Sequence, residues 1–168
     1  MPIHSIEPVF DEKSKVLILG SFPSAKSREV NFFYGHKQNR FWRVLSNVLG
    51  EIEPFTTAEK KAFLLKKRIA LWDVIGECDI EGSSDSTIRN VKENDLSTIL
   101  DTAEIRRIYV NGKCAEKYYK RYILPKIKID CVSLPSTSPA NAAFSFDRLC
   151  SEWSTVAKEL EESSKTCK

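Results

Sequence analysis

The chain lacks the short motifs that mark several common classes of enzyme. Its 168 residues contain no GxGxxG, no GxxxxGKS/T and no GxSxG, so the sequence does not indicate a dinucleotide-binding, P-loop or hydrolase-elbow protein. The five cysteines never form CxxC, and none pairs with a histidine at ligand spacing, so we expect no metal site. Only two histidines are present, His4 and His36, which restricts the choice of a catalytic base.

Long apolar runs are absent as well. No stretch of about 18 apolar residues exists that could span a bilayer, and the start of the chain has no charged-then-apolar signal pattern. We therefore expect an intracellular, cytoplasmic protein with no membrane partner. A chain of 168 residues with no internal repeat fits one domain over residues 1–168, and we expect a monomer.

Neither acidic nor basic residues are in large excess, but the two kinds are concentrated in different segments of the chain. Against 26 Lys and Arg stand 23 Asp and Glu, a net charge of +3. Residues 73–104 carry a net charge of −7, residues 106–128 carry +7 and residues 26–43 carry +4. Two interpretations remain open at this point: a basic face that binds phosphates, or solvated helix faces that happen to cluster.

Four short apolar runs are typical of buried strands in a parallel sheet, and they cover residues 16–20, 69–74, 107–112 and 127–134. Helical patterns alternate with these runs. The first covers residues 41–49 and ends at Gly50, and the second buries Ala62, Phe63 and Leu65. A third, basic helix is stopped by Pro125, and a fourth begins after Ser145, beyond the last strand. This alternation predicts an α/β fold with parallel strands. Ligands in such folds bind at the carboxyl ends of the strands.

Three segments show no such periodicity. Residues 1–15 are polar and predict an N-terminal arm with little structure of its own, and residues 163–168 predict a polar tail. Residues 76–91 are rich in Gly, Ser and Asp and predict a long loop, which in a compact domain is usually functional or mobile.

Four sequence blocks resemble the uracil-DNA glycosylase superfamily, and most closely its hypoxanthine-DNA glycosylase branch, known as family six. They are LILGSFPS at residues 17–24, YGHKQNRFW at 34–42, ALWDVI at 70–75 and LPSTSPANA at 134–142. The resemblance covers roughly residues 8–153. It implies a three-layer α/β/α sandwich with a central four-stranded parallel sheet, and a glycosidase that needs no metal and no cofactor. One departure is Ile80, where members of this branch often carry Arg.

The resemblance places the catalytic asparagine on Asn39. The first block contains no carboxylate, so the handling of water is expected to fall to Asn39, whose carbonyl oxygen could hold a water below the anomeric carbon and favour the positive charge that develops there. The alternative interpretation is that Asn39 only caps the helix that follows. Residues expected to form the base pocket are Ser21, Phe22, Pro23, Trp72, Asp73 and Asn111. Residues expected to contact DNA are Ser24, His36, Lys37, Ser136, Thr137, Ser138, Pro139 and Asn141.

Several of these residues also have a structural interpretation. Phe22 is suited to stack on a flipped base, or to pack in the core. Asp73 is suited to accept the N1–H that hypoxanthine has and adenine lacks, or to cap a loop. Asn111 is suited to contact the base, or to form a turn with Gly112. His36 is expected to contact phosphate or to donate a proton to the leaving base, and residues 139–141 to wedge into the duplex.

The expected activity is that of a monofunctional DNA glycosylase. It would hydrolyse the N-glycosidic bond of hypoxanthine, with uracil and xanthine as further candidate bases, and its partner would be DNA containing deaminated bases. Two alternatives remain: an α/β hydrolase that uses Ser21 or His36 on a small ester or nucleotide, and a nucleic-acid-binding module without catalysis.

Overall fold

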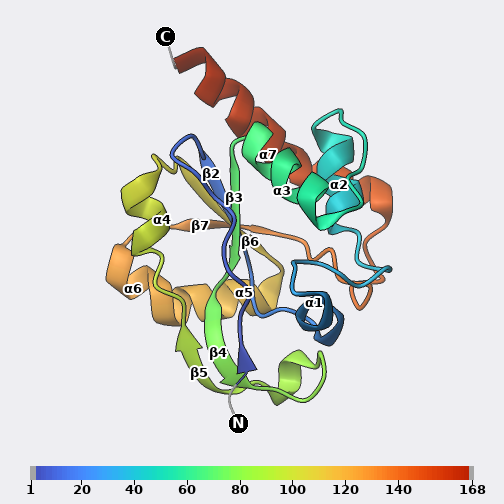
Figure 1. Cartoon of the computed structure of the whole chain (residues 1–168), viewed down its shortest axis with the longest axis vertical. Coiled ribbons are helices and arrows are strands. Elements are labelled where there is room, and N and C mark those ends of the chain that lie inside the picture. Colours follow the sequence, from blue (N-terminus) through green and yellow to red (C-terminus); the bar gives the residue numbers. More distant parts are fainter. Residues whose placement is uncertain (1–2, 167–168) are drawn as a thin grey trace.

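A four-stranded parallel sheet forms the centre of the computed structural model, which describes residues 3–166 (Figure 1). Its strand order is β3–β2–β6–β7, formed by Ile69–Asp73, Val16–Gly20, Arg107–Asn111 and Cys131–Leu134. All three neighbouring pairs are parallel. The helices lie on both sides of this sheet, so the expected three-layer α/β/α sandwich is confirmed.

Alternate residues of each strand point to opposite faces of the sheet and build two separate cores. One core contains Ile18 and Leu71 from the sheet and is covered by α2 (Phe41–Val48), α3 (Thr57–Lys66) and α7 (Phe146–Thr166). The other contains Leu17 and Leu19 and is covered by α4 (Ser97–Thr102), α5 (Lys113–Tyr118) and the π-helical turn that follows. A sheet covered on both faces explains why its strands read as continuous apolar runs.

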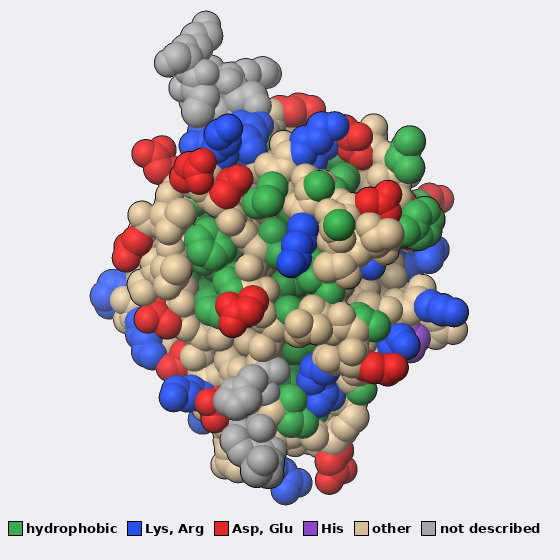
Figure 2. Space-filling view, in the orientation of Figure 1, with side chains coloured by type: hydrophobic (Ala, Val, Ile, Leu, Met, Phe, Trp, Pro, Cys, Tyr) green, Lys and Arg blue, Asp and Glu red, His purple; other side chains and the backbone are tan. Residues whose placement is uncertain are grey.

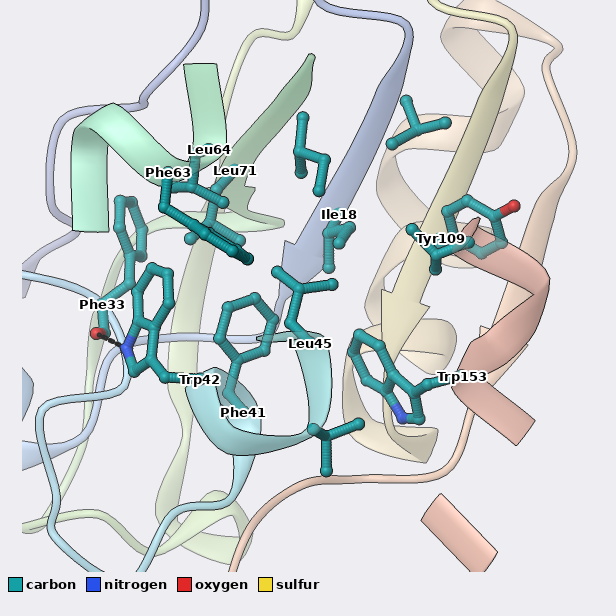
Figure 3. Close-up of a cluster of buried hydrophobic side chains, with 14 of the residues drawn as sticks. Ile18, Phe33, Phe41, Trp42, Leu45, Phe63, Leu64, Leu71, Tyr109 and Trp153 are labelled. Carbon is teal, nitrogen blue, oxygen red and sulfur yellow. Dashed lines mark hydrogen bonds between the residues drawn. The ribbon is translucent and has the colours of Figure 1, made fainter. Parts of the chain in front are cut away.

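Aromatic side chains fix helix α2 against the sheet (Figure 3). Phe41 makes edge-to-face contacts with Trp42 and Trp153, and the Trp42 indole donates to the Phe33 carbonyl oxygen at 3.2 Å. Such pairs contribute roughly 0.5–1.5 kcal/mol each beyond the area that they bury. The start of α2, two residues after Asn39, is therefore firmly packed against the sheet.

The prediction of a long loop over residues 76–91 is wrong. Strands β4 (Ile75–Asp79) and β5 (Arg89–Glu93) pair there as an antiparallel hairpin, with a 3₁₀ turn at Asp85–Thr87 between them. Both strands are largely polar and half exposed, so they lack the apolar alternation that predicts a strand. The N-terminal residues stabilise the hairpin, because β1 (Ile3–His4) pairs with β4 and completes a second, three-stranded sheet.

The arm over residues 1–15 is also more structured than predicted. Beyond β1, Ile6 and Val9 are buried in the first core, and the Val9 backbone bridges to Leu71 in an antiparallel manner. The Trp72 indole donates to the Ile6 carbonyl oxygen at 2.7 Å. Residues 1 and 2 lie outside the described residues.

Three details of the predicted elements differ in the structure: the end of a helix, the start of a strand and the buried face of another helix. Pro125 does not stop the basic helix: α6 (Leu124–Ile127) continues from the π-helical turn Tyr119–Ile123, because proline is tolerated in a first helical turn, where its missing N–H needs no partner. The last strand consequently starts at Cys131 rather than at residue 127. In α3 the buried pair is Phe63 and Leu64, whereas Ala62 is exposed.

The C-terminal tail predicted from residue 163 is helical instead, because α7 extends to Thr166; residues 167 and 168 lie outside the described residues. Across residues 3–166, no helix is both long and apolar enough to cross a membrane. Acidic and basic side chains are interspersed over the face shown in Figure 2.

Candidate active site

A cavity of about 990 Å³ opens at the carboxyl edge of the parallel sheet. The ends of all four strands contribute to it, as expected for an α/β sheet. Most of the residues proposed from the sequence line this cavity: Ser21, Phe22, Pro23, Ser24, His36, Asn39, Asp73, Asn111, Ser136, Thr137, Ser138, Pro139 and Asn141.

Asn39 is held by two hydrogen bonds to its side-chain oxygen. The Phe41 N–H donates to Oδ1 at 2.9 Å, and the Thr137 hydroxyl donates to the same atom at 2.9 Å. Thr137 in turn accepts from Asn111 Nδ2 at 3.0 Å, and its N–H donates to Asn111 Oδ1 at 3.1 Å. The end of β6, the loop after β7 and the start of α2 therefore meet in one hydrogen-bonded chain.

This arrangement identifies the free end of the Asn39 amide. A carbonyl oxygen has two lone pairs, and both already accept hydrogen bonds here. The amide nitrogen Nδ2 has no described protein partner, and the residue lines the cavity. The structure thus favours Nδ2, rather than the carbonyl oxygen expected from the sequence, as the atom that faces a ligand. The capping interpretation also holds in part, because Asn39 satisfies a helical N–H although Arg40 occupies the N-cap position.

Arg40 anchors the loop that follows β7. Its guanidinium donates to the carbonyl oxygens of Phe144 at 2.6 Å, Asn141 at 3.1 Å and Ser138 at 3.3 Å. Its backbone N–H donates to the Thr137 carbonyl oxygen at 3.0 Å. The loop expected to contact DNA is therefore held in place by the residue next to Asn39.

A second set of hydrogen bonds joins the first two sequence blocks. Ser24 accepts from the Ser27 N–H and donates its hydroxyl to Ser27 Oγ at 3.0 Å, which caps the short helix α1 (Ala25–Val30). Ser27 Oγ accepts from the Gly35 N–H at 2.9 Å. The hydroxyl hydrogen of Ser24 is therefore used within the protein, which weighs against its predicted contact with a phosphate.

Two buried oxygen atoms meet above Gly20. A side-chain carbon at this glycine would lie 2.6 Å from Asp73 Oδ1 and 2.9 Å from Tyr34 Oη. Within residues 3–166, neither Asp73 Oδ2 nor Tyr34 Oη has a hydrogen-bond partner. Burial raises the pKa of Asp73 to about 7, so this carboxyl group is partly protonated near neutral pH.

The Tyr34 hydroxyl stays protonated. Burial raises its pKa well above the usual range, and the nearby Asp73 raises it further. The Asn111 side chain opposes this shift, although its contact with the hydroxyl does not reach standard hydrogen-bond geometry. Tyr34 therefore presents a neutral O–H group to the cavity.

Cys114 and Asp85 face each other on another part of the cavity wall. Burial raises the pKa of the Cys114 thiol to about 11, and the Asp85 charge adds to this effect. Burial also raises the pKa of Asp85, while a hydrogen bond from Cys114 lowers it. The thiol is thus protonated at neutral pH and unsuited to act as a nucleophile.

Two predicted site residues do not line the cavity. Trp72 lies between the two cores and its indole is bound to Ile6, so the structure places it outside the base pocket. Lys37 is exposed and lies beyond the cavity wall. His36 does reach the cavity, and its Nδ1 accepts from the Gln38 N–H at 3.1 Å, which leaves Nε2 to donate. No described hydrogen bond joins His36 to Ser21.

Sequence reasoning missed several residues of the site. Arg40, Ser27 and Tyr34 lie within or beside the blocks quoted above, but their partners are distant in the chain or arise from a turn, so no spacing pattern reveals them. Lys113 lies on the cavity wall as the first residue of the predicted basic helix, which directly follows a strand end and Gly112. Along residues 3–166, no three His, Cys, Asp or Glu side chains are grouped so that they could hold a metal ion.

Comparison with known proteins agrees with this geometry. The family model of the uracil DNA glycosylase superfamily matches residues 7–160. A Methanosarcina acetivorans protein named hypoxanthine DNA glycosylase is 39% identical over 150 residues, which cover 88% of this chain and 93% of the relative. A Methanosarcina barkeri protein of the same name is 34% identical over 136 residues, which cover 80% of this chain and 85% of the relative.

A solved structure has the same architecture. It is a solution NMR structure of a Methanosarcina acetivorans protein described provisionally as a uracil DNA glycosylase. The TM-score is 0.81 at 36% sequence identity, and the match covers 96% of this chain and 99% of that one. The resemblance inferred from the four sequence blocks is thus confirmed, and the chain belongs to the uracil DNA glycosylase superfamily.

Proposed function

We propose that this protein is a DNA glycosylase that removes hypoxanthine, and also uracil or xanthine, from deaminated DNA. The observation that carries the proposal is the convergence of Asn39, Asp73 and Asn111 on one cavity at the carboxyl edge of the sheet. The names of the two Methanosarcina relatives support the choice of hypoxanthine. The product is an abasic site in an intact strand.

The reaction starts when the damaged nucleotide leaves the base stack, which costs a few kcal/mol and least at mismatched or unpaired bases. The C1′–N9 bond then breaks, and its electron pair moves into the departing base. A water oxygen forms the new bond to C1′ and releases a proton to solvent. The protein accelerates these steps mainly by presenting oriented dipoles to the charges that develop.

Asn39 positions the water in this proposal. With Oδ1 committed to Phe41 and Thr137, the Nδ2 group donates to the water oxygen and leaves its other lone pair directed at C1′. The two hydrogen bonds to Oδ1 also polarise the amide, which strengthens Nδ2 as a donor. The amide acts without removing a proton, because its pKa is far from neutral.

Asp73 recognises the edge of the base that carries N1. Its buried carboxyl group accepts the N1–H of hypoxanthine, whereas adenine has a lone pair at this position. A pKa of about 7 keeps part of the population uncharged, which reduces repulsion of the negative charge on the departing base. Asn111 lines the same cavity from the end of β6, on the other side of β2, and contacts a ring acceptor.

The loop after β7 holds the flanking phosphates. Ser136 Oγ accepts from the Ser138 N–H, and Ser138 Oγ accepts from the Ala140 N–H, both at 3.1 Å. Each of these hydroxyls keeps its hydrogen for a phosphate oxygen, whereas the Thr137 hydrogen is already donated to Asn39. His36 Nε2 provides a further donor, and the turn over residues 139–141 enters the gap left by the flipped nucleotide.

The direct test is incubation of the protein with oligonucleotides that contain a single inosine, uracil or xanthine, in duplex and single-stranded form. Release of the free base, with strand cleavage only after alkali treatment, is expected for inosine; an adenine oligonucleotide serves as the control. Binding of inosine DNA without base release would identify a binding module instead. Hydrolysis of small esters with no action on DNA would identify a hydrolase.

A further inference from the structure

Tyr34 lines the cavity but has no part in the reaction proposed above. Its ring stacks on Phe41, with centroids 4.0 Å apart and an interplanar angle of 16°. Its backbone φ of 52° lies in the left-handed region, which a bulky residue rarely adopts. Such strain persists where the surrounding structure enforces it, and it is concentrated at functional sites.

The position of the Tyr34 hydroxyl is unusual for a buried polar group. In native proteins nearly all such groups have a hydrogen-bond partner, yet Tyr34 Oη and Asp73 Oδ2 have none among the described residues. Both side chains converge above Gly20, whose lack of a side chain allows their oxygen atoms to approach the strand end closely. Two unpaired polar groups at one point of a cavity indicate that a ligand supplies their partners.

We propose that Tyr34 is a catalytic residue that donates its hydroxyl hydrogen to the exocyclic oxygen of the flipped base, beside the N–H that Asp73 accepts. This inference rests on the proposed glycosylase function. The two residues together recognise a lactam edge, in which an N–H group lies next to a C=O group.

The chemistry of the bases fits this pair. Hypoxanthine, xanthine and uracil all present a lactam edge, whereas adenine and cytosine present a ring lone pair next to an amino group. When the glycosidic bond breaks, negative charge spreads over the leaving base and reaches its exocyclic oxygen. A donor fixed at that oxygen binds the transition state more strongly than the ground state and therefore accelerates the reaction. Guanine has the same edge, so its exclusion requires another contact.

The Tyr34→Phe variant separates this role from a structural one. In the free protein the hydroxyl makes no described hydrogen bond, so its removal is expected to leave the thermal midpoint unchanged or slightly raised. On inosine DNA the single-turnover rate is expected to fall about 10-fold, within a range of roughly 3- to 100-fold for the loss of one hydrogen bond. A tyrosine that only packs against Phe41 would show no such loss.

The experiment compares the rate of base release from inosine DNA with the rate from DNA that contains purine deoxyriboside, a nucleoside whose base has no exocyclic oxygen. Tyr122→Phe serves as the matched control, because Tyr122 lies on the second core away from the cavity. The expected result is a loss confined to Tyr34→Phe and to inosine. An unchanged rate on inosine, or an equal loss in rate or affinity on both DNAs, would overturn the proposal. If the wild-type protein released no base from inosine DNA, the result would contradict the proposed function itself and not only the role of Tyr34.

Discussion

In the proposed reaction, Asn39 combines a structural and a chemical role through the two ends of one amide group. Its oxygen satisfies the Phe41 N–H at the start of α2 and accepts from Thr137, while its nitrogen faces the cavity. The two interpretations left open by the sequence are therefore compatible. Substitution of Asn39 by an apolar residue therefore removes a helix-stabilising contact and a dipole at the site together.

Replacement of Asn39 by Ala is expected to reduce kcat on inosine DNA about 100- to 1,000-fold, the usual effect of removing one preorganised dipole. Loss of the acceptor for the Phe41 N–H should lower the free energy of unfolding by about 1 kcal/mol. Single-turnover kinetics and chemical denaturation measure the two effects. Asn47→Ala, at an exposed position of the same helix, is the control. Near-wild-type activity of Asn39→Ala would exclude its catalytic role.

The carboxyl group of Asp73 links stability to pH. In the folded protein it still binds a proton between about pH 4 and pH 7, where the unfolded chain has released it, because burial raises its pKa to about 7. Folding is therefore favoured at low pH, and this contribution is lost as the pH rises towards 7. Compared with Asp73→Asn, the wild-type protein should lose about 2–3 kcal/mol of stability between pH 5 and pH 8.

Urea denaturation of both proteins at several pH values tests this prediction, since all other titrating groups are shared. Parallel curves for wild type and Asp73→Asn would show that the Asp73 pKa is not raised. The same comparison in the glycosylase assay is informative, because an amide offers both an acceptor and a donor to a lactam edge but cannot titrate.

At the scale of the elements, Arg40 joins the start of α2 to the loop after β7. Its guanidinium binds three carbonyl oxygens of that loop, and the sequence separations reach 104 residues. Planar guanidinium groups can satisfy several acceptors at once, which a lysine ammonium in the same place cannot do with the same geometry. The loop is thus positioned by a residue that needs no contact with DNA.

Arg40→Lys is expected to loosen this loop. Loss of charge-assisted hydrogen bonds worth about 1.5–3 kcal/mol each should raise hydrogen exchange of the amides in residues 138–144 about 10-fold or more. The KM for inosine DNA should rise more than kcat falls, because Asn39 keeps its own hydrogen bonds. Arg43→Lys, at an exposed position of α2, provides the control. Unchanged exchange in the loop would show that Arg40 does not hold it.

On the scale of the whole molecule, the basic residues do not all serve the same purpose. Lys113 lies on the wall of the cavity, at the carboxyl edge of the sheet. Lys66 ends helix α3 just before β3 and therefore lies at the opposite edge, where it pairs with Glu51 at 4.0 Å. If the cavity receives the flipped base as proposed, cations near the carboxyl edge meet the phosphates of the duplex and those at the opposite edge do not.

Substitution of Lys113 by Gln should therefore weaken DNA binding and reduce its dependence on salt. Each phosphate contact contributes about 0.9 to the slope of log K against log salt, so the slope should become less steep by about that amount. Lys66→Gln should leave both affinity and slope unchanged. Fluorescence anisotropy at several salt concentrations measures these quantities, and equal slopes for the two variants would place the DNA elsewhere.

Much of this protein could be predicted from local patterns in its sequence. The continuous apolar runs at residues 16–20, 69–74 and 107–112 indicated buried parallel strands, and the polar residues after each run indicated where the site would be. The strand predictions are confirmed, because burial on both faces of a sheet imposes an apolar run that a short stretch of sequence shows directly. Asn39 was proposed from the sequence because it lies in a block that resembles a known family.

Tertiary structure alone decided the features that depend on distant contacts. The hairpin β4–β5 was missed because pairing with β1, rather than its own apolar pattern, stabilises it. Only the folded chain brings Thr137 to Asn39 across 98 residues and so determines which end of the amide is free. The meeting of Tyr34 and Asp73 above Gly20 likewise follows from a left-handed turn and from strand register, and neither leaves a periodic signal in the sequence.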